Sequence, residues 1–152
     1  MGKPLKRDKA LQPLSREHHH ALLFCWKIRT GLNRNIELSR IRNYVFWFYQ
    51  HHLLPHFAEE ENLLFPLLGN NHELVKIAIG QHQTIHHLFA QNLETVENLH
   101  LIDKTLEQHI RFEERILFNE IQNSISAEAI KQFELSARNQ SFIEDWKDPF
   151  WK

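Results

Sequence analysis

Apolar residues recur three and four positions apart along most of the chain. Leu22 and Cys25 follow this spacing, as do Ile102, Leu106 and Ile110. The spacing places apolar side chains along one side of a helix, and no window alternates between apolar and polar residues as a half-buried strand would. The pattern therefore predicts an all-α protein.

Capping and helix-breaking residues divide this pattern into five helices. Ser15, Asp103 and Ser126 are expected N-caps, and Gly31 and Gly69 are expected to end helices. The predicted helices span about 15–30, 37–68, 72–99, 103–123 and 127–145. We therefore expect an up-down four-helix bundle with an additional C-terminal helix. The expected organisation is a tail at 1–13, the bundle at 14–123, and a C-terminal helix and tail at 124–152 packed on the bundle.

Pro55 lies inside the second predicted helix. A proline there removes one backbone hydrogen bond and is expected to kink the helix one turn before His56. Two interpretations are open at this stage: a tolerated kink, or a bend that aims His56 inward.

Composition narrows the class of protein. The 152 residues fit one domain, and a net charge of −1 gives no electrostatic indication of nucleic-acid binding. No apolar run approaches the roughly 18 residues that cross a bilayer, and no signal peptide is evident, so a cytoplasmic protein is expected. Cys25 is the single cysteine and is expected in the core, which excludes an internal disulfide and a thiolate metal cage.

Twelve histidines are unusual for this length, and several occur in a repeated motif. Residues 56–65 (HFAEEENLLF) match residues 109–118 (HIRFEERILF), with histidine, paired glutamates and Leu-Phe at identical offsets. Residues 17–24 (EHHHALLF) resemble residues 81–89 (QHQTIHHLF). The chain thus consists of two helix pairs that carry similar polar residues in the same order.

The spacing within these motifs indicates a metal site. Three pairs of residues are four apart: His56 with Glu60, His82 with His86, and His109 with Glu113. Residues four apart lie on one helix face, and these faces are otherwise apolar. Burying a carboxylate there costs several kcal/mol unless it is paired or binds a metal. Imidazole and carboxylate without sulfur suit iron, manganese or zinc, and the number of donors suits two ions bridged by carboxylates.

These motifs resemble the hemerythrin family, in its bacterial HHE cation-binding branch. The resemblance runs from about Leu14 to Ile121 and covers one histidine on the first helix, His-x3-Glu, His-x3-His, and His followed by a carboxylate. It implies two iron ions, an oxo or hydroxo bridge, and dioxygen or another small diatomic molecule as ligand. The implied metal ligands are His18, His56, Glu60, His82, His86, His109 and Glu113. By the resemblance, three histidines (His82, His86, His109) hold one iron, His18 and His56 hold the other at an open position, and both glutamates bridge.

Two ligand assignments leave alternatives. Oxygen-carrying hemerythrins have an aspartate five residues after the fourth-helix histidine, whereas this chain has Glu114 there and Glu113 at four. We favour Glu113 because it mirrors Glu60. His18 is favoured over its two histidine neighbours because it aligns with His82. The other histidines of the motifs are expected on the surface or behind the ligands: His19, His20, His51, His52 and His87. Glu59 and Glu61 are expected on a solvated face rather than as ligands.

Because the fourth helix departs from the aspartate pattern of the oxygen carriers, oxygen sensing and the handling of iron or oxidative stress are alternative functions to oxygen carriage. Rival functions are a metal scaffold with zinc or another divalent cation and no oxygen chemistry, a di-iron peroxidase or oxidase, and a signalling module. A ferritin-like oxidase uses Glu-x-x-His pairs on two helices and is disfavoured, because Glu97 to His100 has this spacing but lies at a predicted helix end. Binding rather than turnover is expected. The aromatic tail at 146–151 is expected either to cap the bundle or to form a homodimer contact, and no nucleic-acid or membrane partner is expected.

Overall fold

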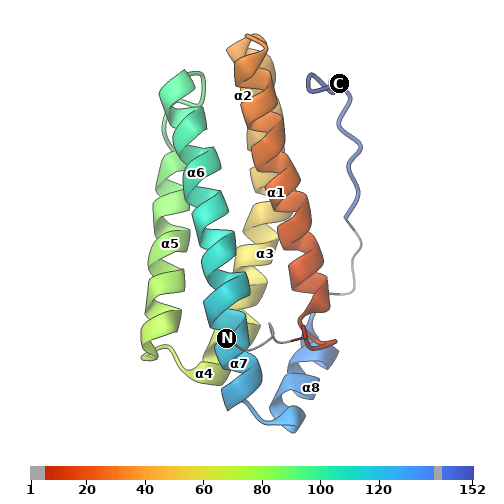
Figure 1. The fold of residues 1–152 in the computed structure, drawn as a ribbon, viewed down its shortest axis with the longest axis vertical. Helices are drawn as coiled ribbons and strands as arrows, with labels where there is room; N and C mark the ends of the chain where they lie inside the picture. Colours follow the sequence, from red (N-terminus) through yellow and green to blue (C-terminus); the bar gives the residue numbers. More distant parts are fainter. Residues whose placement is uncertain (1–5, 139–141) are drawn as a thin grey trace.

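The computed structural model describes residues 6–138 and 142–152, and it is helical, with no strand in these ranges. Four long helices stand side by side in up-down order, with a short fifth helix at one end (Figure 1). This confirms the predicted all-α bundle with an additional C-terminal helix.

The first column is α1 (Gln12–Asn33), and the third is α5 (Glu73–Phe89). The second column combines α2 (Leu38–Phe48), α3 (Leu54–Glu59) and α4 (Phe65–Leu68) through π-helical turns η1 (Tyr49–Leu53) and η2 (Glu60–Leu64). The fourth combines α6 (Val96–Phe112), the π-helical turn η3 (Glu113–Leu117) and α7 (Phe118–Ser124). The short fifth helix is α8 (Ala127–Ser136).

Pro55 follows directly after the π-helical turn η1, where the backbone bonding already departs from the α pattern. The N–H of Leu54 bonds to the carbonyl of Tyr49, five residues back. Because η1 changes the hydrogen-bonding register just before Pro55, the missing N–H of the proline falls where the helix is already irregular. His56, the next residue, is buried.

The boundary between the third and fourth helices differs from the prediction. The third helix ends at Phe89, and the fourth begins at Val96 with Thr95 as its N-cap, whose hydroxyl accepts from the N–H of Asn98. Asp103 was expected as the cap but lies inside α6, buried, where Arg29 donates to its Oδ1 at 2.6 Å. A buried carboxylate with an arginine partner can occupy a helix interior, so an acidic residue alone did not mark the helix start.

The first and fifth helices also end at other residues than predicted. The first begins at Gln12 without a side-chain cap at Ser15, and it continues past Gly31. Gly31 is buried inside this helix, and a Cβ there would lie 2.7 Å from Phe150 and 2.9 Å from Ile41, so the close packing requires glycine. The fifth helix ends at Ser136 rather than near 145; three of the residues it was expected to include, 139–141, lie outside the described part of the chain.

The C-terminal segment at 142–152 runs back along α1 in an extended path (Figure 1). Alternate residues of this segment contact the bundle. Glu144 accepts from Lys27 at 2.5 Å and from Tyr44 at 2.6 Å, Asp148 accepts two bonds from Arg40, and Phe150 is buried. The period of two explains why a helix-period prediction failed here.

The apolar core consists of two separate clusters. One surrounds Phe24, Ile28 and Phe48, and the other surrounds Leu64 and Phe118 at the end where α8 packs. Buried polar residues lie between the clusters in every long helix. They are His18, His56, Glu60, His82, His109 and Glu113. We call this set the polar layer.

The helices of the described residues include none with the length and apolar character that a membrane span requires.

Candidate metal centre

Six of the seven predicted ligands meet in the polar layer. They form two groups whose ligand atoms all lie within 4.8 Å of one another, one with His18 and His56, the other with His82 and His109. Glu60 and Glu113 belong to both groups. Two carboxylates shared between two clusters of imidazoles are the arrangement that a pair of bridged cations requires.

The distances across the layer are those of groups that face a common space. Oε1 of Glu113 lies 3.0 Å from Nε2 of His18 and 3.4 Å from Nε2 of His109. Glu60 lies 3.3 Å from Nε2 of His56 and 3.2 Å from Nε2 of His82. Each helix thus turns its donor atoms toward the two central carboxylates.

Several of these atoms have no hydrogen-bond partner although they are buried. They include both carboxylate oxygens of Glu60, both of Glu113, and Nε2 of His82 and of His109. An unpartnered buried carboxylate is costly, and a cation in contact with it removes that cost. The residues present therefore fit metal ions at this place.

The opposite nitrogen of each imidazole is held by a second residue. Nδ1 of His18 donates to Glu114 at 2.7 Å, and Nδ1 of His56 donates to Glu17 at 2.9 Å. A bond of this kind fixes the ring orientation and leaves Nε2 with a free lone pair that can bind a metal.

The other two imidazoles of the layer are held in the same way. Nδ1 of His82 donates to Glu61 at 2.6 Å, and Nδ1 of His109 donates to Gln81 at 2.6 Å. All four histidines thus direct Nε2 into the layer.

These outer partners follow the sequence repeat, although the sequence reasoning did not identify them as partners of particular histidines. The residue directly before the first histidine of each pair, Glu17 or Gln81, bonds to the histidine of the next helix. Of the residues directly after the central glutamates, Glu61 in the second column bonds to His82 in the third, and Glu114 in the fourth column bonds to His18 in the first. The sequence signal that could have identified these partners is the pair of matching dipeptides EH at 17–18 and QH at 81–82, together with the two EE dipeptides at 60–61 and 113–114.

The π-helical turns place these adjacent glutamates. The turns η2 and η3 begin at Glu60 and Glu113, at matching positions of the repeat. In η2, Glu60 faces Nε2 of His82 at 3.2 Å while Glu61 reaches Nδ1 of the same ring at 2.6 Å. A single wide turn thus supplies both a central carboxylate and the residue that orients a ligand, which fits the frequent occurrence of such turns at functional sites.

Comparison with known protein families supplies a classification. The family model described as the hemerythrin HHE cation-binding domain matches residues 10–121. The chain belongs to the hemerythrin family. Neither the curated proteins nor the solved structures that were searched include a match. The matched range contains the first three columns, the fourth as far as Ile121, and the whole polar layer of this hemerythrin domain, and it agrees with the resemblance inferred from the motifs.

His86 is the predicted ligand that the structure does not bring into either group. It is half-buried one helical turn from His82, and its Nδ1 lies 2.6 Å from the hydroxyl of Tyr49. Tyr49 is the first residue of η1. Its hydroxyl contacts Nδ1 of His86, just as Oε1 of Gln81 contacts Nδ1 of His109. The role of His86 as a ligand of this hemerythrin domain stays a prediction.

The sequence left two choices of ligand, between Glu113 and Glu114 and between His18 and its histidine neighbours, and the residues of each choice lie in different places in the hemerythrin domain. Glu113 lies in the polar layer, whereas Glu114 bonds to His18 and Ser15 behind it. His18 lies in the layer, whereas His20 stacks on Phe142 at 3.9 Å between ring centroids.

Glu59 was expected on a solvated surface, and that expectation was wrong. Its side chain is buried and pairs with Arg138. Glu61 retains partial exposure while it holds His82. Cys25 is buried, as expected for a core residue.

The electrostatics of the layer favour cations. Burial alone would lower the pKa of His18, but the nearby carboxylates of Glu113 and Glu114 raise it to about 9. Burial likewise opposes protonation of His82, while the nearby carboxylates of Glu60 and Glu61 raise its pKa to about 9. Burial and the nearby charge of Glu113 raise the pKa of Glu60 well above its usual range. Bound protons thus neutralise the layer when metal ions do not.

Proposed function

We propose that this hemerythrin domain holds two iron ions in the polar layer and binds dioxygen or another small diatomic molecule there. His18 and His56 would hold one ion, and His82, His86 and His109 would hold the other. Glu60 and Glu113 would bridge the two ions. The observation that carries the proposal is the pair of unpartnered, fully buried carboxylates common to both groups.

The two ions would have unequal surroundings. The second group can gain His86 as a third imidazole, whereas Leu22 stands at the corresponding position of the first helix. The ion held by His18 and His56 therefore has fewer protein ligands. This difference is the reason to place the small-molecule ligand on that ion, because a binding ion needs an open coordination position. Iron in such a site supplies reversible electron transfer to a diatomic ligand.

The chain's own residues prepare this space. Phe118 stacks beside His18 at 5.3 Å between ring centroids, and Phe57 stacks on His82 at 4.1 Å. These rings, together with the two apolar clusters, keep bulk water from the carboxylates. The outer partners Glu114 and Glu17 hold His18 and His56 with Nε2 turned inward. Binding rather than turnover is our proposal, because the described residues lining the layer offer donors for ions and a dry space.

Metal content and absorption test this function together. The protein is loaded with ferrous iron without oxygen, the iron per chain is measured, and absorption is recorded before and after exposure to air. Two irons per chain and charge-transfer bands that return on oxygen after reduction support the proposal. Stoichiometric zinc in place of iron, or iron without an oxygen-dependent spectrum, contradicts it. His18→Ala should lose one iron, whereas His19→Ala, a neighbour outside both groups, should keep two.

Steady consumption of peroxide distinguishes the oxidase or peroxidase alternative. If loaded protein consumes peroxide catalytically and His56→Ala abolishes this, turnover replaces binding as the function.

A further inference from the structure

Two arginines outside the family-matched range of 10–121 reach the outer partners of His18 and His56. Arg138 follows α8, and Arg7 precedes α1. Both therefore belong to segments that flank the hemerythrin domain, yet both contact carboxylates that hold its candidate ligands.

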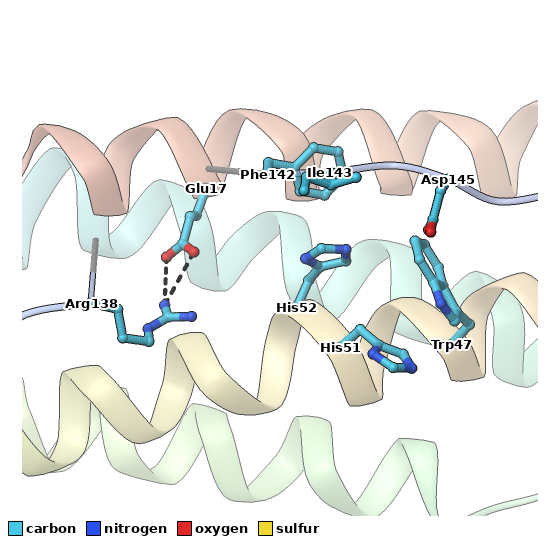
Figure 2. Close-up of a pocket in the computed structure, with 8 residues that line it drawn as sticks. All are labelled: Glu17, Trp47, His51, His52, Arg138, Phe142, Ile143 and Asp145. Carbon is cyan, nitrogen blue, oxygen red and sulfur yellow. Dashed lines mark hydrogen bonds and ion pairs between the residues drawn. The ribbon is translucent and has the colours of Figure 1, made fainter. Parts of the chain in front are cut away.

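Arg138 is the more closely bound of the two. Its Nη2 donates to both oxygens of Glu17 at 3.0 and 3.1 Å (Figure 2). Its Nε donates to Glu59. The oxygen of Glu17 that lies 3.0 Å from Arg138 is also the one 2.9 Å from Nδ1 of His56. One carboxylate oxygen thus joins the arginine to the ligand ring.

Solvent competes for this carboxylate. Glu17 and Arg138 line a cavity of about 510 Å³ together with His52 and Phe142 (Figure 2). Each side chain of the pair is 27% exposed, whereas His56 is buried. Without the arginine, Glu17 could turn toward the water of the cavity and gain rotamer freedom. The guanidinium fork of Arg138 bonds Glu17 through Nη2 and Glu59 through Nε, and this restrains Glu17 on His56.

Arg7 supports His18 in a similar but looser way. Its Nη2 donates to the backbone carbonyl of Glu114 at 2.7 Å and lies 3.7 Å from Oε1 of the same residue. Glu114 in turn accepts from Nδ1 of His18 at 2.7 Å and from the hydroxyl of Ser15. The contact to the carboxylate is charge attraction without a hydrogen bond, so a smaller effect is expected than for Arg138.

The other half of the layer has no such support within the described residues. Glu61, which holds His82, has only histidines as charged neighbours, and Gln81, which holds His109, is uncharged. The arginines therefore act on the half of the layer that contains His18 and His56.

We propose that Arg138, and to a lesser degree Arg7, are positioning residues for the metal ion held by His18 and His56. The proposal rests on the proposed function of the polar layer. Each arginine holds a carboxylate in one orientation, and that carboxylate keeps the ligand imidazole turned toward the ion. The segments flanking the family domain thus adjust one of the two metal positions selectively.

Competition for ferrous iron tests the proposal. Wild type, Arg138→Gln and Arg7→Gln are loaded without oxygen and titrated with a chromogenic chelator, which gives a dissociation constant for each of the two irons. His18→Ala identifies which constant belongs to the ion near His18. Loss of a partner behind a ligand typically weakens metal binding about 10–100-fold, and Arg138 stands one contact further out, so about tenfold is expected for that ion. The constant of the other ion should stay unchanged.

Arg40→Gln is the matched control. Arg40 makes two bonds to Asp148 and so also ties the C-terminal segment to the bundle, but it contacts no ligand or outer partner of the layer. It should leave both constants unchanged. Arg138→Lys keeps the charge and loses the fork, so an intermediate loss is expected. In a Glu17→Gln background, Arg138→Gln should add little further loss if it acts through Glu17.

Three results would overturn the proposal. The first is unchanged iron affinity in both Arg138→Gln and Arg138→Lys. The second is an equal loss for both ions, and the third is an equal loss in Arg40→Gln, since either indicates general destabilisation. If Arg138→Gln does not fold, Arg138→Lys and its Glu17→Gln double variant decide alone. Wild type that binds no iron would refute the proposed function as well, whereas wild type with two irons and unaltered variants refutes the role of the arginines alone.

Discussion

Glu60→Gln should have little effect on the stability of the metal-free protein and a large effect on the stability of the metal-loaded protein. Glu60 is fully buried, its two oxygens have no hydrogen-bond partner, and it belongs to both ligand groups. Burial and the charge of Glu113 raise its pKa well above the usual range, which favours the protonated form in the metal-free protein. Glutamine has the shape of a protonated glutamate. The substitution therefore removes little from the metal-free protein but removes a charged bridge from the loaded one.

The magnitude follows from linkage between binding and folding. An ion present at 100 times its dissociation constant stabilises the folded state by about 2.7 kcal/mol, so two ions contribute about 5 kcal/mol. A chain of this length gains about 2–4 °C in Tm for each kcal/mol, which gives a rise of roughly 10–20 °C for wild type on loading. If loss of this bridging charge weakens each ion about 100-fold, each ion contributes only about 0.4 kcal/mol, so Glu60→Gln should keep less than about a quarter of the rise.

The assay is thermal unfolding followed by circular dichroism, with chelator and with ferrous iron in the absence of oxygen. Glu97→Gln is the control, because it makes the same chemical change at an exposed position of α6. It should keep the full rise. If Glu60→Gln retains the wild-type rise, or if wild type shows none, then the shared carboxylate does not hold ions and the reasoning fails.

Three further outcomes are expected. Because the pKa values of His18 and His82 are raised to about 9 from the ordinary 6.5, their stabilising charges are fully present below about pH 6.5 and are lost as pH rises through about 9, so the Tm of chelator-treated protein should fall over that window; a flat profile contradicts this. Gly31→Ala should destabilise the protein by about 1–3 kcal/mol in urea unfolding, whereas Gly80→Ala, where nothing lies within 4 Å, should stabilise it by about 0.5–1 kcal/mol. Glu114→Gln should keep both irons with about 10–100-fold weaker binding of one, and complete loss of iron would show that it is itself a ligand.

The sequence predicts the centre well because its donors follow helix periodicity. The repeated spacing of four residues brought His56 with Glu60, and His109 with Glu113, into one buried layer. That periodicity is a local property, and a bundle of straight helices converts it directly into spatial proximity. His86 shares the spacing, but Tyr49 takes its Nδ1, and no local pattern connects residues on different helices.

The parts that sequence reasoning missed depend on contacts between distant segments. The break at 90–95 contains neither proline nor glycine, so only the Thr95 cap marks it. Asp103 imitates a cap because its partner, Arg29, lies on another helix. The pairing of Glu59 with Arg138 joins residues 79 positions apart. The periodicity of the sequence cannot predict such partners, because they depend on how the columns pack against one another.

The polar layer divides the apolar core into two clusters, and each long helix crosses from one cluster to the other through it. Apolar contact alone therefore does not join the two ends of the bundle. The two ends are joined by the helices themselves and, in the interior, by imidazoles and carboxylates that carry protons or can hold cations. We therefore expect ion occupancy to raise the cooperativity of unfolding, so that the two ends of a loaded bundle open together more strictly than those of a bundle stripped of ions.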